Sequence, residues 1–194
     1  KGSIFLSGVG KSGHIARKIA STLTSTGSPA YFIHPTEASH GDLGLIKSKD
    51  VIILLSNSGK SKELLDLLSF AKNKKIVSLL ITANQESKLS RMSTHNIILP
   101  KLKEVGKNNI APTTSTTMML ALGDAIALSV SEIKKFPVCK FGEFHPGGNI
   151  GAKFLAVEDV MHTKKQIPLT KEDTSMKEVI IKISNKNFGC IGVI

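Results

Sequence analysis

A polar run at residues 56–61 is the first segment whose side chains could bind a ligand. It follows the apolar stretch 51–55 and precedes a stretch with helical periodicity. Hydroxyl groups, free backbone N–H groups and a glycine that allows close approach are what a phosphate monoester needs. A simple turn with a helix cap would need only one such residue, so the run favours a ligand site. The predicted phosphate-binding residues are Ser56, Ser58 and Ser61.

A second hydroxyl-rich run, residues 113–117, stands at the start of a long apolar stretch. Capping a helix uses one hydroxyl, and five in succession exceed that need. We therefore expect this run to contribute to the same phosphate pocket. The predicted binding residues are Thr113, Ser115 and Thr116.

The glycine-rich segment 8–13 formally matches the dinucleotide-binding pattern G-x-G-x-x-G. That function needs an acidic residue at the end of the second strand, where this chain has His34 and Pro35. A nucleoside-triphosphate loop is disfavoured as well, because Phe5 occupies the position of its first glycine. What remains is an anion site at the start of a helix. The predicted site residues are Gly10, Lys11 and Ser12.

Short β-branched runs alternate with longer amphipathic runs along the chain, a pattern typical of right-handed β-α-β crossovers. The expected strands cover residues 3–7, 30–33, 51–55, 77–82 and 96–99. The expected helices cover about residues 13–25, 61–73, 87–92 and 113–133. The predicted fold class is therefore α/β, with an open, doubly wound, five-stranded parallel sheet. In such a sheet ligands bind at the carboxyl ends of the strands, where the polar segments stand.

The stretch 113–133 is apolar on nearly all sides, which predicts that it lies in the core or at a subunit interface. Asp124 interrupts this stretch. We interpret Asp124 as a hydrogen-bond partner between helices rather than as a catalytic acid.

The chain changes character after residues 147–151, which read Gly-Gly-Asn-Ile-Gly. Beyond them a helix is expected around residues 175–184 and a strand from Phe188. We therefore predict one domain over residues 1–153 and a second over residues 154–194. The first residue is Lys and both ends fall in strand-like runs, so the chain is expected to be a fragment of a longer protein.

Composition and charge limit the class of protein. The 194 residues are 41% hydrophobic and 21% charged, as in ordinary globular proteins. The formal net charge is +11, but only Arg17 and Arg91 among the 26 basic residues are Arg, and there is one Tyr and no Trp. Nucleic-acid recognition relies on Arg and aromatic stacking, so no nucleic-acid partner is predicted. No apolar run reaches about 18 residues and the two Cys show no disulfide or metal spacing, so we expect a cytoplasmic protein without a membrane partner.

Taken in order, several segments resemble the sugar isomerase (SIS) domain, most closely that of D-arabinose 5-phosphate isomerases. The segments are Gly8-Val9-Gly10-Lys11-Ser12-Gly13-His14, His34-Pro35-Thr36-Glu37-Ala38-Ser39-His40-Gly41-Asp42-Leu43-Gly44, Ser56-Asn57-Ser58-Gly59, Ala111-Pro112-Thr113-Thr114-Ser115-Thr116-Thr117 and His145-Pro146-Gly147-Gly148. Asp159-Val160-Met161-His162 resembles the opening of a cystathionine-β-synthase-type (CBS) module. The resemblance implies a flavodoxin-like SIS domain over residues 1–153 and a truncated CBS module over residues 154–194.

The resemblance also implies an activity. It implies interconversion of D-ribulose 5-phosphate and D-arabinose 5-phosphate through a cis-enediol, with no cofactor and no obligatory metal. It further implies a sugar phosphate as the small-molecule partner, a homotetramer with sites between subunits, and a place in lipopolysaccharide synthesis. By position, the catalytic residues of the family fall on Lys11, Glu63, Glu104 and His145.

Each of these residues has an implied role. Glu104 is the expected base, although the Lys-rich segment 101–104 by itself would suggest an exposed acid. Glu63 is the second acid–base candidate. The alternative interpretation is that its negative charge only complements the dipole at the start of a helix. His145 would act in ring opening or proton transfer, and Lys11 would orient substrate oxygens or stabilise enediolate charge. A buried carboxylate suited to proton transfer is expected to have its pKa raised toward neutrality.

Two alternatives stay open, a non-catalytic phosphosugar sensor and another phosphosugar isomerase on the same scaffold. Lys60 stands where relatives often carry Glu, which leaves the exact substrate open. His40 shares a polar loop with His34, Glu37 and Asp42, whose spacing matches no closed zinc site. Adventitious, inhibitory zinc at His40 is the one metal-binding expectation.

Overall fold

The computed structural model describes residues 2–194, which divide into two compact units. The first unit ends at Phe144 and the second is His145–Ile194. The assignment of residues 1–153 and 154–194 to an SIS domain and a CBS module stays a prediction.

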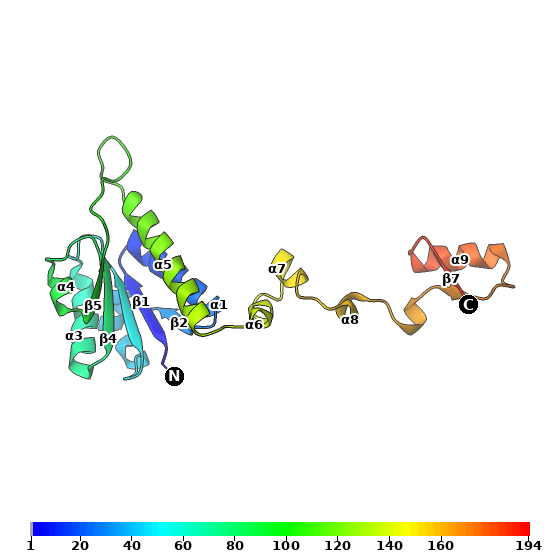
Figure 1. Ribbon diagram of the computed structural model, residues 1–194, viewed down its shortest axis with the longest axis horizontal. Helices are drawn as coiled ribbons and strands as arrows, with labels where there is room; N and C mark the ends of the chain where they lie inside the picture. The colour runs from blue at the N-terminus through cyan, green and yellow to red at the C-terminus, as the bar shows by residue number, and fades with distance from the viewer. Residues whose placement is uncertain (1) are drawn as a thin grey trace. The chain divides into compact units, whose positions relative to one another are not determined.

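The first unit is built on a five-stranded parallel sheet (Figure 1). Its strands are β1 (Ile4–Gly8), β2 (Ala30–Phe32), β3 (Val51–Leu55), β4 (Val77–Thr82) and β5 (His95–Ile98). They are hydrogen-bonded in the order β2-β1-β3-β4-β5, and every neighbouring pair is parallel. Each predicted strand lies within about one residue of the observed one, the usual uncertainty of element ends.

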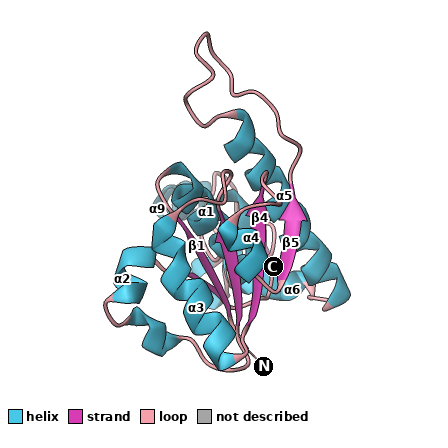
Figure 2. Ribbon diagram, turned by 90° about the vertical axis from the view of Figure 1, so that its left-hand side faces the viewer, coloured by secondary structure: helices cyan, strands magenta, loops and turns pink. Residues whose placement is uncertain are grey.

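Helices cover both faces of this sheet (Figures 1 and 2). One face carries α1 (Lys11–Ser25) and α5 (Thr114–Ile133), and the other carries α2 (Pro35–Ser39), α3 (Leu65–Lys74) and α4 (Lys88–Met92). The remaining elements of the unit are the 3-10 turns η1 (Asp42–Leu45) and η2 (Lys62–Leu64) and the helix α6 (Val138–Glu143). The predicted doubly wound α/β fold is confirmed. The sequence pattern missed α2, η1 and α6, which are too short to show a periodicity.

Alternate strand residues fill two apolar layers. On one face the buried strand residues are Phe5, Ile52, Leu54 and Leu80, and on the other they are Leu6, Ile53, Leu55 and Ile81. Successive side chains of a strand point to opposite faces, so a strand covered on both faces must be apolar at every position. This is why the central strands could be recognised from the sequence.

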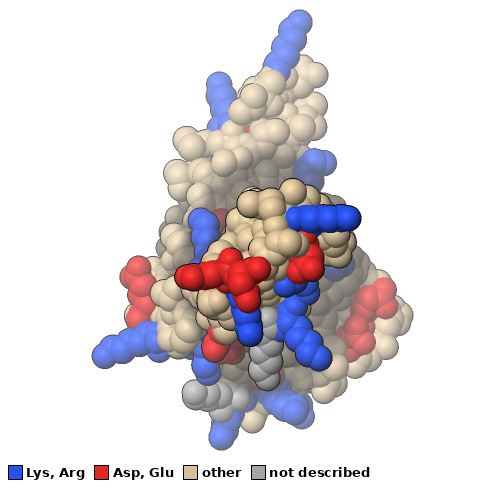
Figure 3. Space-filling model, turned by 90° about the vertical axis from the view of Figure 1, so that its right-hand side faces the viewer, with Lys and Arg blue, Asp and Glu red and all other residues tan. Residues whose placement is uncertain are grey.

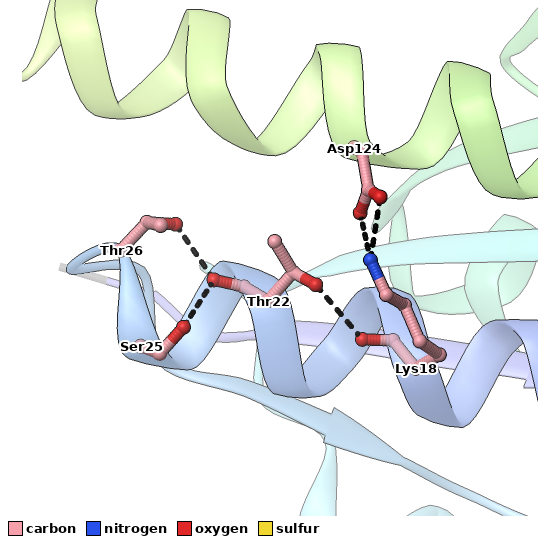
Figure 4. A network of polar contacts seen from close by, with 5 residues as sticks. All are labelled: Lys18, Thr22, Ser25, Thr26 and Asp124. Atoms are coloured by element: carbon pink, nitrogen blue, oxygen red, sulfur yellow. Dashed lines mark hydrogen bonds and ion pairs between the residues drawn. The ribbon is translucent and has the colours of Figure 1, made fainter. Parts of the chain in front are cut away.

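The helix α5 packs on α1 through a narrow stripe. Its buried residues are Ser115, Met119, Gly123 and Ala127, one in every four. At Gly123 the two helices approach so closely that an added Cβ would lie 2.3 Å from the Ile19 side chain. Next to this contact Lys18 of α1 pairs with Asp124 of α5 (Figure 4). The interpretation of Asp124 as a partner between helices is therefore confirmed.

Gly123→Ala should destabilise the protein, although Ala is normally the better helix former by about 1 kcal/mol. The added methyl group would overlap the buried Ile19, and overpacking of this kind costs about 1–3 kcal/mol. We expect chemical denaturation to show a free energy of unfolding lower by about 1–2 kcal/mol. Gly44→Ala is the matched control, because a Cβ there meets nothing within 4 Å. Unchanged stability of Gly123→Ala would contradict the close helix packing.

The outer side of α5 is much more exposed than its apolar sequence predicts. Leu128 is 55% exposed and Ile133 is 81% exposed. By length and composition alone α5 could cross a membrane, a test that core helices of soluble proteins also pass. Among the described residues of α5, only those of the stripe that packs on α1 are buried.

The second unit contains a pair of parallel strands, β6 (Leu169–Thr170) and β7 (Gly192–Val193), joined through α9 (Met176–Lys186). Its other elements are α7 (Gly148–Ala152), α8 (Val157–Val160) and the 3-10 turn η3 (Lys164–Gln166). The helix predicted around residues 175–184 is confirmed by α9. The strand predicted from Phe188 is wrong at its start, because Asn187 and Gly189 have φ angles of 57° and 69°, outside the extended region.

Basic side chains can be followed on one face of the molecule (Figure 3). Figure 3 shows Lys and Arg side chains interspersed with acidic and uncharged residues on the face that it draws. On that face the positive charge does not gather into one patch.

Candidate functional site

The carboxyl edge of the sheet collects three polar segments. We call residues 8–13 the glycine loop, residues 56–61 the serine loop and residues 101–113 the projecting loop. The register pairs Gly8 with Leu55, so the glycine and serine loops leave neighbouring strands at the same level. The projecting loop follows β5 and extends beyond the same edge (Figure 1).

The serine loop is fastened to the end of β4. The Ser56 N–H donates to the Ile81 carbonyl (3.1 Å), and the Ala83 N–H donates to the Asn57 carbonyl (3.0 Å). The hydroxyls of Ser56 and Ser61 are hydrogen-bonded at 2.9 Å. The loop is therefore preformed, with buried Ser56 and half-buried Ser61 side by side.

Gly59 gives the serine loop its turn. Its φ is 63°, its N–H donates to the Ser56 carbonyl (3.1 Å), and an added Cβ would lie 2.1 Å from Ser87 Oγ. Ser58 is exposed next to it, and its hydroxyl accepts from the Lys60 N–H (3.3 Å). Glycine is thus required both by the backbone conformation and by the close approach of Ser87.

The glycine loop opens α1 with Gly10 in a positive-φ conformation (56°). The helix has no side-chain cap, and no acceptor in the described part of the chain contacts the N–H groups of Lys11 and Ser12. An added Cβ at Gly13 would lie 2.6 Å from the Gly8 carbonyl oxygen, so the loop closes tightly on the helix. Open N–H groups at the start of a 15-residue helix favour an anion, and the Lys11 side chain is exposed beside them.

Glu104 is bound to the start of α5. Its Oε2 accepts hydrogen bonds from the Thr113 N–H (2.8 Å), the Thr113 hydroxyl (3.2 Å) and the Ser115 N–H (3.2 Å). Hydrogen bonding by Ser115 and Thr113 outweighs partial burial and lowers the pKa of Glu104 from 4.5 to about 2. The expectation of a raised pKa is therefore wrong for Glu104, because these donors favour the charged form. The carboxylate is ionised at neutral pH.

The Thr113 and Thr116 hydroxyls at the start of α5 form hydrogen bonds within the chain. The Thr113 hydroxyl accepts from the Val105 N–H (2.9 Å), and the Thr116 hydroxyl donates to the Thr113 carbonyl (2.9 Å). The phosphate-binding roles of Thr113, Ser115 and Thr116 stay predictions. The anion that lies at this helix start is the Glu104 carboxylate.

The other predicted catalytic residues are Lys11, Glu63 and His145. Glu63 is exposed in η2, directly after the serine loop. Among the described side chains, no hydrogen bond or ion pair joins Lys11, Glu63 and Glu104 to one another. His145 is half-buried and belongs to the second unit. The fold therefore brings three of the predicted loops to one edge without a direct contact among the described side chains of Lys11, Glu63 and Glu104.

His40 is exposed at the end of α2. The neighbouring polar residues hold α2 in place. His34 Nδ1 accepts from the Thr36 N–H (3.3 Å) at the start of α2, and the Ser39 hydroxyl donates to Asp66 of α3 (2.7 Å). Over the part of the chain that the structure describes, no group of three or more His, Cys, Asp or Glu could hold a metal. Zinc at His40 stays a prediction.

A groove of about 560 Å³ lies along the serine loop and the loop between β4 and α4. Lys60, Lys88 and Asn84 are among its lining residues. Sequence reasoning missed Asn84, whose Nδ2 donates to the Ser58 carbonyl (3.1 Å) and braces the serine loop. Its position directly after β4, at the carboxyl edge, was the signal that could have found it.

A doubly wound sheet with a preformed serine loop and an open helix start at its carboxyl edge has the groups that favour a small anion. The SIS domain family matches residues 1–129, and the chain belongs to that family. The arabinose 5-phosphate isomerase KpsF of Escherichia coli strain CFT073 is 44% identical over 195 residues, which cover 100% of this chain and 58% of that protein. The arabinose 5-phosphate isomerase KdsD of Shigella flexneri is 40% identical over 190 residues, which cover 97% of this chain and 58% of that protein.

A solved structure agrees with these relatives. A protein of Escherichia coli CFT073 in complex with a sugar phosphate is 43% identical and superimposes with a TM-score of 0.73, over 75% of this chain and 78% of that one. The predicted family is therefore confirmed. The chain spans 58% of the length of the two curated relatives, so the activity of the whole protein is a matter of proposal.

Proposed function

We propose that this protein is an aldose–ketose isomerase that interconverts D-ribulose 5-phosphate and D-arabinose 5-phosphate. The observation that carries the proposal is the ionised Glu104, held by α5 at the edge that also bears the serine loop. The two curated relatives, at 44% and 40% identity, support the choice of substrate.

The serine loop is the proposed phosphate site. Its hydroxyls at Ser56, Ser58 and Ser61 would donate to the phosphate oxygens, and the N–H groups near Gly10 and Ser12 would face the same anion. A loop that is already held in shape loses little conformational entropy on binding. Thr113, Ser115 and Thr116 would complete the pocket.

In the proposed reaction Glu104 removes the proton from C2 of the open-chain aldose. The C–H electron pair forms the C1–C2 double bond, and the carbonyl oxygen O1 takes up a proton, which gives the cis-enediol. The O2 hydroxyl then loses its proton as the C2 carbonyl forms, and Glu104 returns a proton to C1 to give the ketose. Such proton transfers need a positioned acid and base and require no cofactor.

The remaining catalytic residues would serve the oxygen atoms. Glu63 or His145 would transfer protons at O1 and O2 and assist ring opening. Lys11 would stabilise the negative charge that develops on these oxygens.

The assembly and setting of the protein belong to the same proposal. We propose an SIS domain over residues 1–153, a CBS module that begins at residue 154, and a cytoplasmic homotetramer with sites between subunits, acting in lipopolysaccharide synthesis. In such a tetramer His145 could act in the site of a neighbouring subunit. Support for these points comes from the resemblance of the sequence.

The experiment that tests the activity is proton exchange at C2 of arabinose 5-phosphate in deuterated water, with the full-length protein. Exchange together with formation of ribulose 5-phosphate is the expected result. Tight binding of the sugar phosphate without exchange would contradict it and favour a sensor. Exchange of other phosphosugars in preference to arabinose 5-phosphate would indicate a different isomerase.

A further inference from the structure

Thr113 contacts the candidate base through two donors. Its N–H and its hydroxyl both donate to Glu104 Oε2, at 2.8 and 3.2 Å, and the Ser115 N–H reaches the same oxygen at 3.2 Å. Three donors on one oxygen fix the orientation of the carboxylate plane. The other oxygen, Oε1, receives none of these bonds.

The Thr113 hydroxyl also holds the chain on the far side of Glu104. It accepts from the Val105 N–H at 2.9 Å, so one side chain joins the residue after Glu104 to the start of α5. The projecting loop is thereby closed at its base across eight residues of sequence. Loss of this hydroxyl would remove one of the hydrogen bonds to Glu104 and release the Val105 N–H, while the N–H groups of residues 113 and 115 still contact Oε2.

We propose that Thr113 is a positioning residue that holds Glu104 by Oε2 and thereby presents Oε1 to the carbon-bound proton of the substrate. The inference rests on the proposed function, in which Glu104 is the base. In this proposal the Thr113 hydroxyl orients the base, whereas the sequence predicted that it binds the substrate phosphate. Correct positioning of the base raises the reaction rate, because misalignment of the reacting groups by about 1 Å can cost about 10²-fold in rate.

Few other groups can control the protonation of Glu104. The first turn of α5 contains no acidic residue. Lys101, Lys103 and Lys107 are exposed in the projecting loop, and none of the described cations lies within ion-pair distance of Glu104. Hydrogen bonds from Thr113 and Ser115 are therefore the main influence on this carboxyl.

Thr113→Val tests the proposal, since it removes the hydroxyl and keeps the shape of the side chain. The pKa of Glu104, followed by the ¹³C shift of its carboxyl carbon in NMR, should rise above about 2, but stay below 4.5, because the Ser115 hydroxyl and the N–H groups of residues 113 and 115 still lower it. Because the base must be deprotonated, kcat/KM should then begin to fall at a higher pH on acidification than it does in the wild type. At pH 8 kcat should drop by about 10-fold through lost orientation, with KM for the sugar phosphate little changed.

Thr113→Ser keeps the hydroxyl and should restore both the pKa and kcat. Ser129→Ala, which removes an exposed hydroxyl further along α5 and outside the proposed pocket, is the matched control and should change neither. An unchanged carboxyl titration in Thr113→Val would overturn the proposal, and so would a raised pKa with unaltered kcat and pH profile. A raised KM for the sugar phosphate with unchanged kcat would also overturn it, because that result would show that the Thr113 hydroxyl binds the phosphate. A wild-type protein without isomerase activity would instead show that the proposed function itself is wrong, independently of the titration.

Discussion

Glu104→Gln should lower kcat for isomerisation by about 10³-fold, the range expected for loss of a general base. Glutamine keeps an oxygen that can accept from the Thr113 and Ser115 N–H groups, so the start of α5 should stay in place. Exchange of the C2 proton in deuterated water should disappear together with turnover. Isothermal titration should show that arabinose 5-phosphate still binds, since the serine loop is untouched.

Glu132→Gln is the matched control for this substitution. Glu132 lies on α5 and is exposed, so its variant should keep wild-type kcat and exchange. A Glu104→Gln protein with full activity would remove Glu104 from the mechanism. Exchange that persists without net turnover would point to Glu63 or His145 as the base.

Glu104→Gln also tests how the stability of the protein depends on pH. The folded protein holds the pKa of Glu104 near 2, below the ordinary 4.5, so the ionised carboxylate stabilises the fold above pH 4.5. This stabilisation is lost as the pH falls through about 2. Glu104→Gln should therefore lower the free energy of unfolding by about 1 kcal/mol at pH 7, the usual size of a capping interaction, and by less than half as much at pH 3. Equal losses at both pH values in chemical denaturation would contradict the low pKa.

Gly59→Ala should weaken binding of the sugar phosphate by about 10- to 100-fold, which corresponds to about 1.4–2.8 kcal/mol. Alanine is strained at a φ of 63°, and its Cβ would lie 2.1 Å from Ser87 Oγ. The serine loop would have to move away from the β4–α4 loop, which would separate the hydroxyls that the proposed site uses. We expect KM to rise with a smaller change in kcat, because the loss is in binding the non-reacting phosphate.

Gly44→Ala serves again as the control, since it introduces the same methyl group where nothing lies within 4 Å. Its KM should equal that of the wild type. A normal KM in Gly59→Ala would show that the phosphate is bound elsewhere, with the hydroxyl-rich start of α5 as the next candidate.

The pattern of the sequence was sufficient for the sheet and for the edge at which the site lies. Residues 51–55 are apolar at every position, and this alone identifies a strand buried on both faces. Parallel strands end at one edge, so polar segments that follow β1 and β3 must lie at the same edge of the sheet. These inferences depend on local periodicity and on chain connectivity, which a sequence contains.

The setting of Glu104 depended on the tertiary structure. In the sequence it is an acid in a Lys-rich segment, the family resemblance implied a base, and the chemistry of buried carboxylates suggested a raised pKa. Its pKa is lowered because Thr113 and Ser115, nine and eleven residues further on, turn their donors onto one of its oxygens. The path of the projecting loop brings these groups together, and no local pattern specifies that path.

The same distinction holds for the glycines. Gly59 and Gly123 are each a single letter in the sequence, but Ser87 and Ile19 meet them from other parts of the chain. The sequence by itself determined the family, the order of strands and helices, and the residue types at the site. Only the tertiary structure decided which of those residues touch, because side-chain contacts, and the pKa values that follow from them, are set by segments distant in sequence.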